Sequence, residues 1–157
     1  MYTGNVTING ISQGIPARLI NKYEFDNFCD SIALTPTQFQ EYIPKAFELR
    51  VTVIGKQIFA VRIDSQKNEK TKIDWRLYTH LNPHSVFTLP PKIESFCFNF
   101  LKEQQLIYGA MDFIVTPNND YVFLENNPFG QYLWLETETG IPLTETMCNL
   151  LAELGDC

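Results

Sequence analysis

Three oxygen-bearing side chains near the end of the chain have the types and spacing needed to bind a metal ion. Residues 109–130 read GAMDFIVTPNNDYVFLENNPFG, in which two β-prone runs flank the turn residues PNND. A two-residue hairpin loop at Asn118-Asn119 would make the runs antiparallel and put Asp112 directly opposite Glu125. Directly opposed residues share a face with their Cβ atoms about 5 Å apart. Asn127, two residues beyond Glu125, points to the same side of the sheet.

These three side chains predict a site for a hard divalent cation. Like charges directly opposite each other destabilise a sheet, so a cation between Asp112 and Glu125 would explain the pair. Mg²⁺ prefers oxygen ligands, and its protein sites usually supply one or two carboxylates. The alternative is a solvent-facing hairpin whose polar residues hold nothing, and the hairpin alone leaves both interpretations open.

Two arginines have the chemistry to bind an anion. Arg50 lies in the middle of the run ELRVTVI, where an arginine either extends to the surface or pairs with an anion, and Glu48 on the same face is an alternative partner. Arg76 follows a polar loop, and its planar guanidinium suits bidentate contact with phosphate. The alternative for Arg76 is an ordinary surface charge.

The segment QEYIPK, residues 40–45, is a candidate for binding a flat heterocycle. Tyr42 and Ile43 are apolar enough to line a pocket, and exposed backbone at a strand end can form hydrogen bonds with such a ring. A plain edge strand is the alternative.

The elements that must position these residues predict an α+β fold with an antiparallel β-sheet and helices packed on one face. Apolar stripes predict a helix at residues 92–106 and a C-terminal helix after Pro142. Residues 1–22 are expected to be irregular or an edge hairpin, and residues 23–34 weakly helical. Strands are expected at residues 37–43, 48–54 and 57–64, with Gly55-Lys56 as a tight turn, and in the two runs around PNND.

The composition is that of one globular domain in a reducing compartment. The chain has 157 residues, 45% of them hydrophobic, and a net charge of −6, which argues against a general nucleic-acid binder. No apolar run is long enough to cross a bilayer, and no secretion signal is evident, so we expect a cytoplasmic protein. The four cysteines have no CxxC spacing and are expected to be reduced thiols, while a zinc site built from them with His80 and His84 fits no structural zinc pattern.

Taken in order, these segments resemble the ATP-grasp superfamily, and in particular the ATP-grasp ligases that form ω-ester and ω-amide links in microviridin-type (graspetide) peptides. A wider resemblance is to ligases that add glutamate to a ribosomal protein. The matching segments are QEYIPKAFELRVTVIG, FAVRIDSQ, DWR and MDFIV…DYVFLENNPFGQYLWLE. The resemblance implies that residues 35–157 form a C-terminal lobe, and that residues 1–34 are an irregular segment of the preceding lobe.

The resemblance also implies a role for each candidate residue. Asp112, Glu125 and Asn127 would bind Mg²⁺, with Mn²⁺ as the alternative ion. ATP would be held by Glu41, Tyr42 and Ile43 at the adenine and by Glu48 at the ribose, with Lys45 nearby, while Arg50 and Arg76 would contact the phosphates or an acyl phosphate. The position two after Arg76, where the wider family often has Asn, is Tyr78 here, which weakens the match at that point.

The implied activity is ATP- and Mg²⁺-dependent ligation of a peptide or protein carboxylate to an amine or alcohol. Related ligases place a further domain and two nucleotide-binding lysines ahead of the matching part, so we expect this chain to be inactive without them, or to work with a complementary N-terminal chain or by self-association. One alternative is a non-catalytic remnant or partner subunit that binds nucleotide or peptide. Another is a different Mg²⁺ enzyme, such as a phosphatase or nuclease. Neither a nucleic acid nor a membrane is an expected partner.

Overall fold

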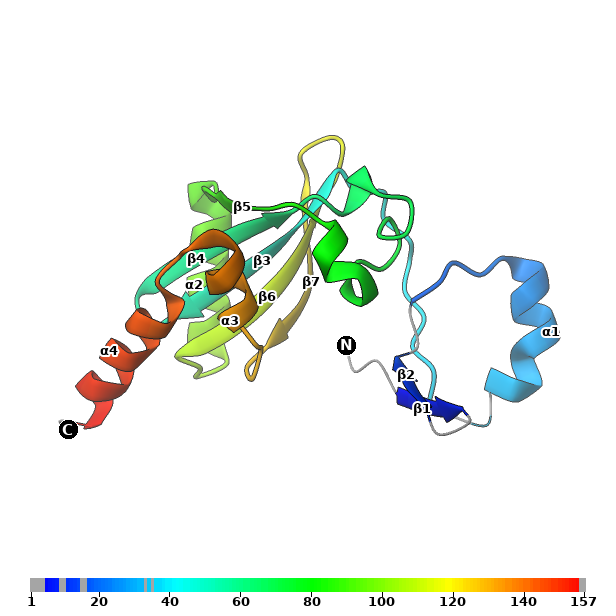
Figure 1. Ribbon diagram of the computed structural model, residues 1–157, viewed down its shortest axis with the longest axis horizontal. Helices are drawn as coiled ribbons and strands as arrows, with labels where there is room; N and C mark the ends of the chain where they lie inside the picture. The colour runs from blue at the N-terminus through cyan, green and yellow to red at the C-terminus, as the bar shows by residue number, and fades with distance from the viewer. Residues whose placement is uncertain (1–4, 9–10, 15–16, 33, 35, 156–157) are drawn as a thin grey trace.

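A computed structural model describes residues 5–8, 11–14, 17–32, 34 and 36–155. At the N-terminal end, a small antiparallel hairpin precedes a helix: β1 (Asn5–Ile8), β2 (Ile11–Gly14) and α1 (Lys22–Ile32). Figure 1 shows these elements beside the main sheet rather than stacked on either of its faces.

The main body is a five-stranded antiparallel sheet with the strand order β5-β4-β3-β6-β7. Its strands are β3 (Phe47–Ile54), β4 (Gln57–Ile63), β5 (His84–Phe87), β6 (Tyr108–Val115) and β7 (Tyr121–Asn127). Three α-helices and two short 3₁₀ helices complete it: α2 (Pro91–Glu103), α3 (Leu133–Thr139), α4 (Leu143–Gly155), η1 (Ser65–Lys67) and η2 (Arg76–Leu81).

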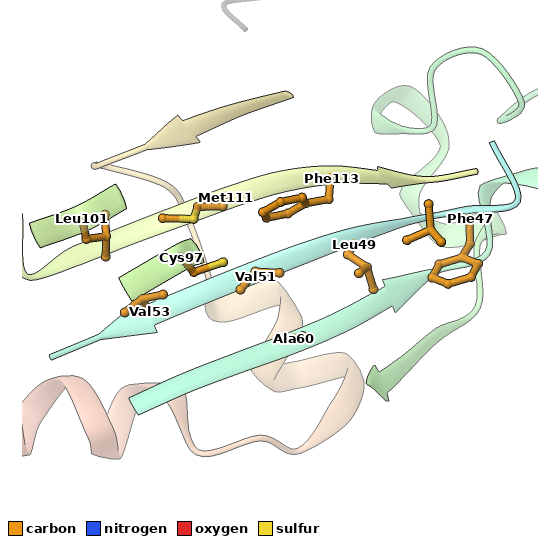
Figure 2. Packing of buried hydrophobic residues seen from close by; sticks show 10 residues of the cluster. Phe47, Leu49, Val51, Val53, Ala60, Cys97, Leu101, Met111 and Phe113 are labelled. Atoms are coloured by element: carbon orange, nitrogen blue, oxygen red, sulfur yellow. The ribbon is translucent and has the colours of Figure 1, made fainter. Parts of the chain in front are cut away.

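Alternation along β3 gives the sheet two different faces. Phe47, Leu49, Val51 and Val53 point to what we call the core face, where they form a cluster with residues of β4, β6 and α2 (Figure 2). Fully burying a side chain of this kind contributes about 1.5–3 kcal/mol, so this cluster is the main source of stability. The other members are Ala60, Cys97, Leu101, Met111, Phe113 and Val115.

The opposite face, which we call the site face, carries Glu48, Arg50, Thr52 and Ile54 from the same strand. A second apolar cluster covers only one end of it, formed by Ile54, Val61, Leu135, Ile141 and Leu143. This cluster seats α3 and α4 against the sheet, in front of it in Figure 1, while α2 lies behind. The polar end of the site face is therefore the part of the sheet that the helices leave for other groups.

The α+β class and the antiparallel sheet predicted from the sequence are confirmed. The expectation of helices on one face is refined, because α2 packs on the core face and α3 with α4 on the site face. The N-terminal hairpin was one of the two expected arrangements for residues 1–22, within the part described.

The strand expected at residues 37–43 is wrong. These residues belong to no helix or strand, and sheet-like hydrogen bonding begins only at Ala46, whose N–H donates to the Val115 carbonyl at 2.7 Å. The fifth strand is instead β5, a short polar strand that pairs with β4 and was missed together with α3. Among the residues described, no helix is long and apolar enough to span a membrane.

Candidate metal and phosphate site

The β6–β7 hairpin brings Asp112 and Glu125 opposite each other, as predicted, but by a different route. The loop has three residues, Pro117 to Asn119, rather than two, and Asn119 takes the left-handed conformation with φ 62°. Such three-residue loops commonly end in a left-handed residue. The longer loop shifts the pairing by one residue, and an extra residue in β7, Leu124, shifts it back as a β-bulge.

Asp112 lies under strong and opposed electrostatic influences. Burial raises the pKa of its carboxyl against the pull of Arg50, the neighbouring Glu125 and Glu48 add to the rise, and the resulting pKa is about 6. The Arg50 Nε atom lies 3.0 Å from Asp112 Oδ1, in an ion pair between directly opposed residues of β3 and β6. The angle does not meet hydrogen-bond geometry, so this buried Nε has no hydrogen-bond acceptor.

Arg76 is held beside this pair by Asp74. Its Nε donates to Asp74 Oδ1 and its Nη2 to Asp74 Oδ2, both at 2.8 Å. These bonds raise the pKa of the guanidinium above its ordinary value, and Glu125 and Asp112 raise it further, so all three lie within electrostatic reach of Arg76.

A shallow hollow of about 520 Å³ connects the two arginines with the end of β7. The loop after β7 lines this hollow, and the Tyr108 hydroxyl holds it by donating a hydrogen bond to the Gly130 carbonyl. A Cβ at Gly130 would overlap the Cβ of Ala110 and come within 3.4 Å of Arg50 Nη1, so only glycine permits this approach. The lining residues are Arg50, Trp75, Arg76, Asn127, Phe129, Gln131 and Trp134.

The predicted nucleotide residues lie at the start of β3 and on the segment before it. Lys45 Nζ lies 2.5 Å from Glu48 Oε1, and Ser65 donates to the same oxygen at 2.9 Å. A ribose hydroxyl at Glu48 would therefore share a carboxylate that already accepts two hydrogen bonds. Glu41, Tyr42 and Ile43 precede β3 and belong to no helix or strand.

The donor set fits a magnesium ion bound jointly with phosphate. Within the described residues no group of three or more His, Cys, Asp or Glu side chains could hold a metal. The predicted set has two carboxylates and the amide of Asn127, which suits Mg²⁺ because that ion keeps waters and takes phosphate oxygens as further ligands. The unfavourable pairing of Asp112 with Glu125 is what a divalent cation would relieve.

Solved structures with the same fold are ATP-grasp ligases. A RiPP-associated ATP-grasp ligase from Chryseobacterium gregarium, in complex with ADP and a leader and core peptide, matches with a TM-score of 0.88 and 31% identity over 96% of this chain. The macrocyclase MdnC from Microcystis aeruginosa MRC, bound with precursor peptide MdnA, matches with a TM-score of 0.81 and 33% identity over 97%. The chain belongs to the ATP-grasp superfamily.

This chain spans less than half of each of those ATP-grasp ligases, 46% of the Chryseobacterium protein and 47% of MdnC. The macrocyclase MdnB, from the same organism as MdnC, matches with 28% identity and a TM-score of 0.65 over 39% of its length. No protein-family model and no curated protein sequence matches the chain. The resemblance to ATP-grasp peptide ligases stated from the sequence is confirmed by these structures.

Of the predicted site residues in this ATP-grasp chain, the structure brings together Arg50, Asp112, Glu125 and Asn127 on the site face, with Arg76 beside them. Glu48 lies on the same face, where Lys45 is its ion-pair partner. The aromatic wall of the hollow was not predicted from the sequence, because Trp75 and Trp134 are distant in the chain and meet only in the fold, with ring centroids 5.5 Å apart.

Proposed function

We propose that this chain supplies one wall of the active site of an ATP- and Mg²⁺-dependent ligase, which joins a peptide carboxylate to an amine or alcohol through an acyl phosphate. The observation that carries the proposal is the site face, where two carboxylates, an amide and two arginines gather at the uncovered end of the sheet. The related ligases in complex with ADP or precursor peptides support the nucleotide and the peptide as ligands.

Asp112, Glu125 and Asn127 are the proposed ligands of the metal. When bound, Mg²⁺ would supply positive charge that neutralises phosphate. Arg50 lies against Asp112, so its guanidinium is placed to contact the same phosphates from β3. Arg76 approaches from the loop before η2, and the pair would stabilise negative charge on the transferring phosphoryl group.

The nucleotide base is assigned to the segment before β3. Glu41, Tyr42 and Ile43 are outside the hydrogen-bonded ladder of the sheet, which leaves their backbone as the proposed contact to adenine. Glu48, at the start of β3 on the site face, is the proposed acceptor for the ribose, with Lys45 fixing its carboxylate.

All these contacts come from the site face of the sheet and the segments next to it, so the 157-residue chain should bind nucleotide weakly and turn over little ATP by itself. A complementary chain or a second copy would supply the opposite wall. Exposed side chains such as Leu34 (82%) and Leu133 (65%) are the kind of apolar surface that promotes such association.

Isothermal titration of the purified chain with ADP, with and without Mg²⁺, tests the proposal. We expect weak binding that needs Mg²⁺ and disappears in Asp112→Asn. Asp120→Asn is the matched control, because it removes the same charge from the exposed tip of the same hairpin. Binding that ignores Mg²⁺, or that falls equally in both variants, would contradict the proposal.

Phosphate release separates the ligase from a non-catalytic binding module. Wild-type chain with ATP and an acidic peptide should release little phosphate, and addition of the N-terminal portion of a related ligase should raise the rate. A module that only binds would show no increase although ADP still binds.

A further inference from the structure

We propose that Asp74 is a positioning residue for Arg76, and that the backbone N–H of Ala17 completes the same clamp. The inference rests on the proposed function, since it concerns how one of the two phosphate-binding arginines is held. It adds a residue that does not itself face the hollow, and it links the segment before α1 to the site.

The clamp is built from four hydrogen bonds on one carboxylate. Besides the two guanidinium bonds, the Arg76 backbone N–H donates to Asp74 Oδ1 at 3.2 Å, and the Ala17 N–H donates to Oδ2 at 3.0 Å. Asp74 is only 6% exposed, and burial raises the pKa of its carboxyl less than these hydrogen bonds lower it. The carboxylate therefore stays charged and fully occupied at neutral pH.

Arg76 needs such a partner because its backbone does not fix it. Arg50 projects from the centre of β3, which is hydrogen-bonded to β4 on one side and β6 on the other. Arg76 instead begins a 3₁₀ segment that is interrupted at Tyr78. A free arginine side chain carries about 2 kcal/mol of rotamer entropy, and a bidentate carboxylate removes most of that freedom before any ligand arrives.

Trp75, between the two partners, anchors the clamp to the rest of the fold. It is 7% exposed, and its ring contacts those of Trp134 and His84 at centroid distances of 5.5 and 6.3 Å. The loop carrying Asp74 and Arg76 is thus seated against α3 and β5, so the arginine is oriented relative to the sheet.

The aspartate–arginine pair of Asp64 with Arg62 serves as an internal control. Asp64 is 9% exposed and accepts hydrogen bonds from Lys67 and, at 2.7 Å, from Arg62. As for Asp74, hydrogen bonds lower the pKa of its carboxyl more than burial raises it. Arg62, however, stacks on the Phe47 ring, 4.0 Å from its centroid, at the end of the core face. Asp64→Asn therefore removes a comparable ion pair away from the hollow.

The first test uses the chain without ligand. In ¹⁵N spectra of arginine side chains, Asp74→Asn should shift the Arg76 Nε–H signal and speed its exchange with water, and should shift the Ala17 amide. Asp64→Asn should change the Arg62 signal and leave Arg76 unchanged. An Arg76 signal that is the same with and without Asp74 would overturn the clamp, whatever the protein binds.

The second test measures the affinity for Mg²⁺ with a non-hydrolysable ATP analogue. Asp74→Asn should weaken binding roughly five- to tenfold and Asp64→Asn should not, although both variants should unfold more easily. In an Arg76→Lys background the Asp74→Asn effect should shrink, since interacting residues are not additive. Asp74→Glu keeps the charge and should bind with an affinity between those of the wild type and Asp74→Asn. If Asp74→Asn does not fold, the smaller loss in Asp74→Glu is compared with Asp64→Asn instead.

The two ideas fail in different ways. Equal losses in Asp74→Asn and Asp64→Asn, or an undiminished loss beside Arg76→Lys, would overturn the positioning role while nucleotide binding by the wild type stands. Absence of Mg²⁺-dependent binding by the wild type would overturn the proposed function, and the ligand-free spectra would still decide the clamp.

Discussion

The two faces of the sheet are built from alternate residues of the same strands, but one face is apolar and packed while the other carries charged residues. On the core face, Leu49, Val51 and Val53 of β3 are at most 1% exposed and pack against α2. On the site face, the interleaved positions Glu48 and Arg50 are also largely buried, but they hold charges that burial disfavours. Apolar residues there would make a more stable sheet, and the proposed ligand site is a functional reason for the polar face.

The largest loss of stability should come from the core face. Phe113→Ala removes a ring that is 2% exposed and packs against Phe96 and Phe123, and should lower the free energy of unfolding by about 3–5 kcal/mol. Urea denaturation measures it. Asn127→Ala, on the exposed end of the site face, should change stability much less, and a reversal of this order would contradict the division of the faces.

Two glycines, one on each face, separate packing from ligand binding. Gly109 approaches Leu101 and Asn126 on the core face, and Gly130 approaches Ala110 and Arg50 on the site face. A methyl group at either position should cost about 1–3 kcal/mol of stability through overpacking.

Only Gly130→Ala should also weaken Mg²⁺–ADP binding, because it pushes the loop away from Arg50. Gly155→Ala, at which a Cβ would meet nothing within 4 Å, is the control for both. Equal effects of Gly109→Ala and Gly130→Ala on ADP affinity would remove the distinction between the faces.

The hydroxyl of Tyr108 gives a smaller effect on the same loop. Tyr108→Phe removes its bond to the Gly130 carbonyl and should cost about 0.5–1.5 kcal/mol. Hydrogen exchange of the backbone amides from Phe129 to Gln131 should rise in the variant, and unchanged exchange would show that the bond does not hold the loop.

The smallest effect should be on acid stability, through Asp64. Burial raises the pKa of this carboxyl, but hydrogen bonds from Lys67 and Arg62 outweigh it and keep the pKa below the ordinary value of 3.8. A lowered pKa in the folded state adds stability above pH 3.8, which is lost as the pH falls through the folded value. The melting temperature should therefore fall more between neutral and acid pH in the wild type than in Asp64→Asn, as measured by thermal unfolding.

The sequence predicted best where one strand carries its own pattern. The run ELRVTVI, expected as a strand at residues 48–54, is β3, and Glu48 and Arg50 share a face as expected, because the period of two is local to the strand. The pairing of Asp112 with Glu125 was also correct, although the loop length behind it was wrong by one residue and the bulge at Leu124 corrected the error. Neither the loop conformation at Asn119 nor the bulge has a signal that outweighs the simpler two-residue turn.

What the sequence did not predict depends on contacts between distant segments. Residues 37–43 have strand-like composition, but β4 already takes the edge of β3 that they would need, and β6 the other. The partners of Arg50 and Glu48 followed the same rule: adjacency suggested that they pair with each other, whereas the fold supplies Asp112 to one and Lys45 to the other.

The central claim is that Asp112, Glu125 and Asn127 surround one divalent cation on the site face. Anomalous X-ray scattering from crystals of the chain grown with Mn²⁺ and saturating ADP tests it most directly. The account predicts one manganese peak within about 2.3 Å of oxygens from these three side chains, next to the phosphates. ADP bound with no manganese peak there, or a peak on other residues, would contradict it.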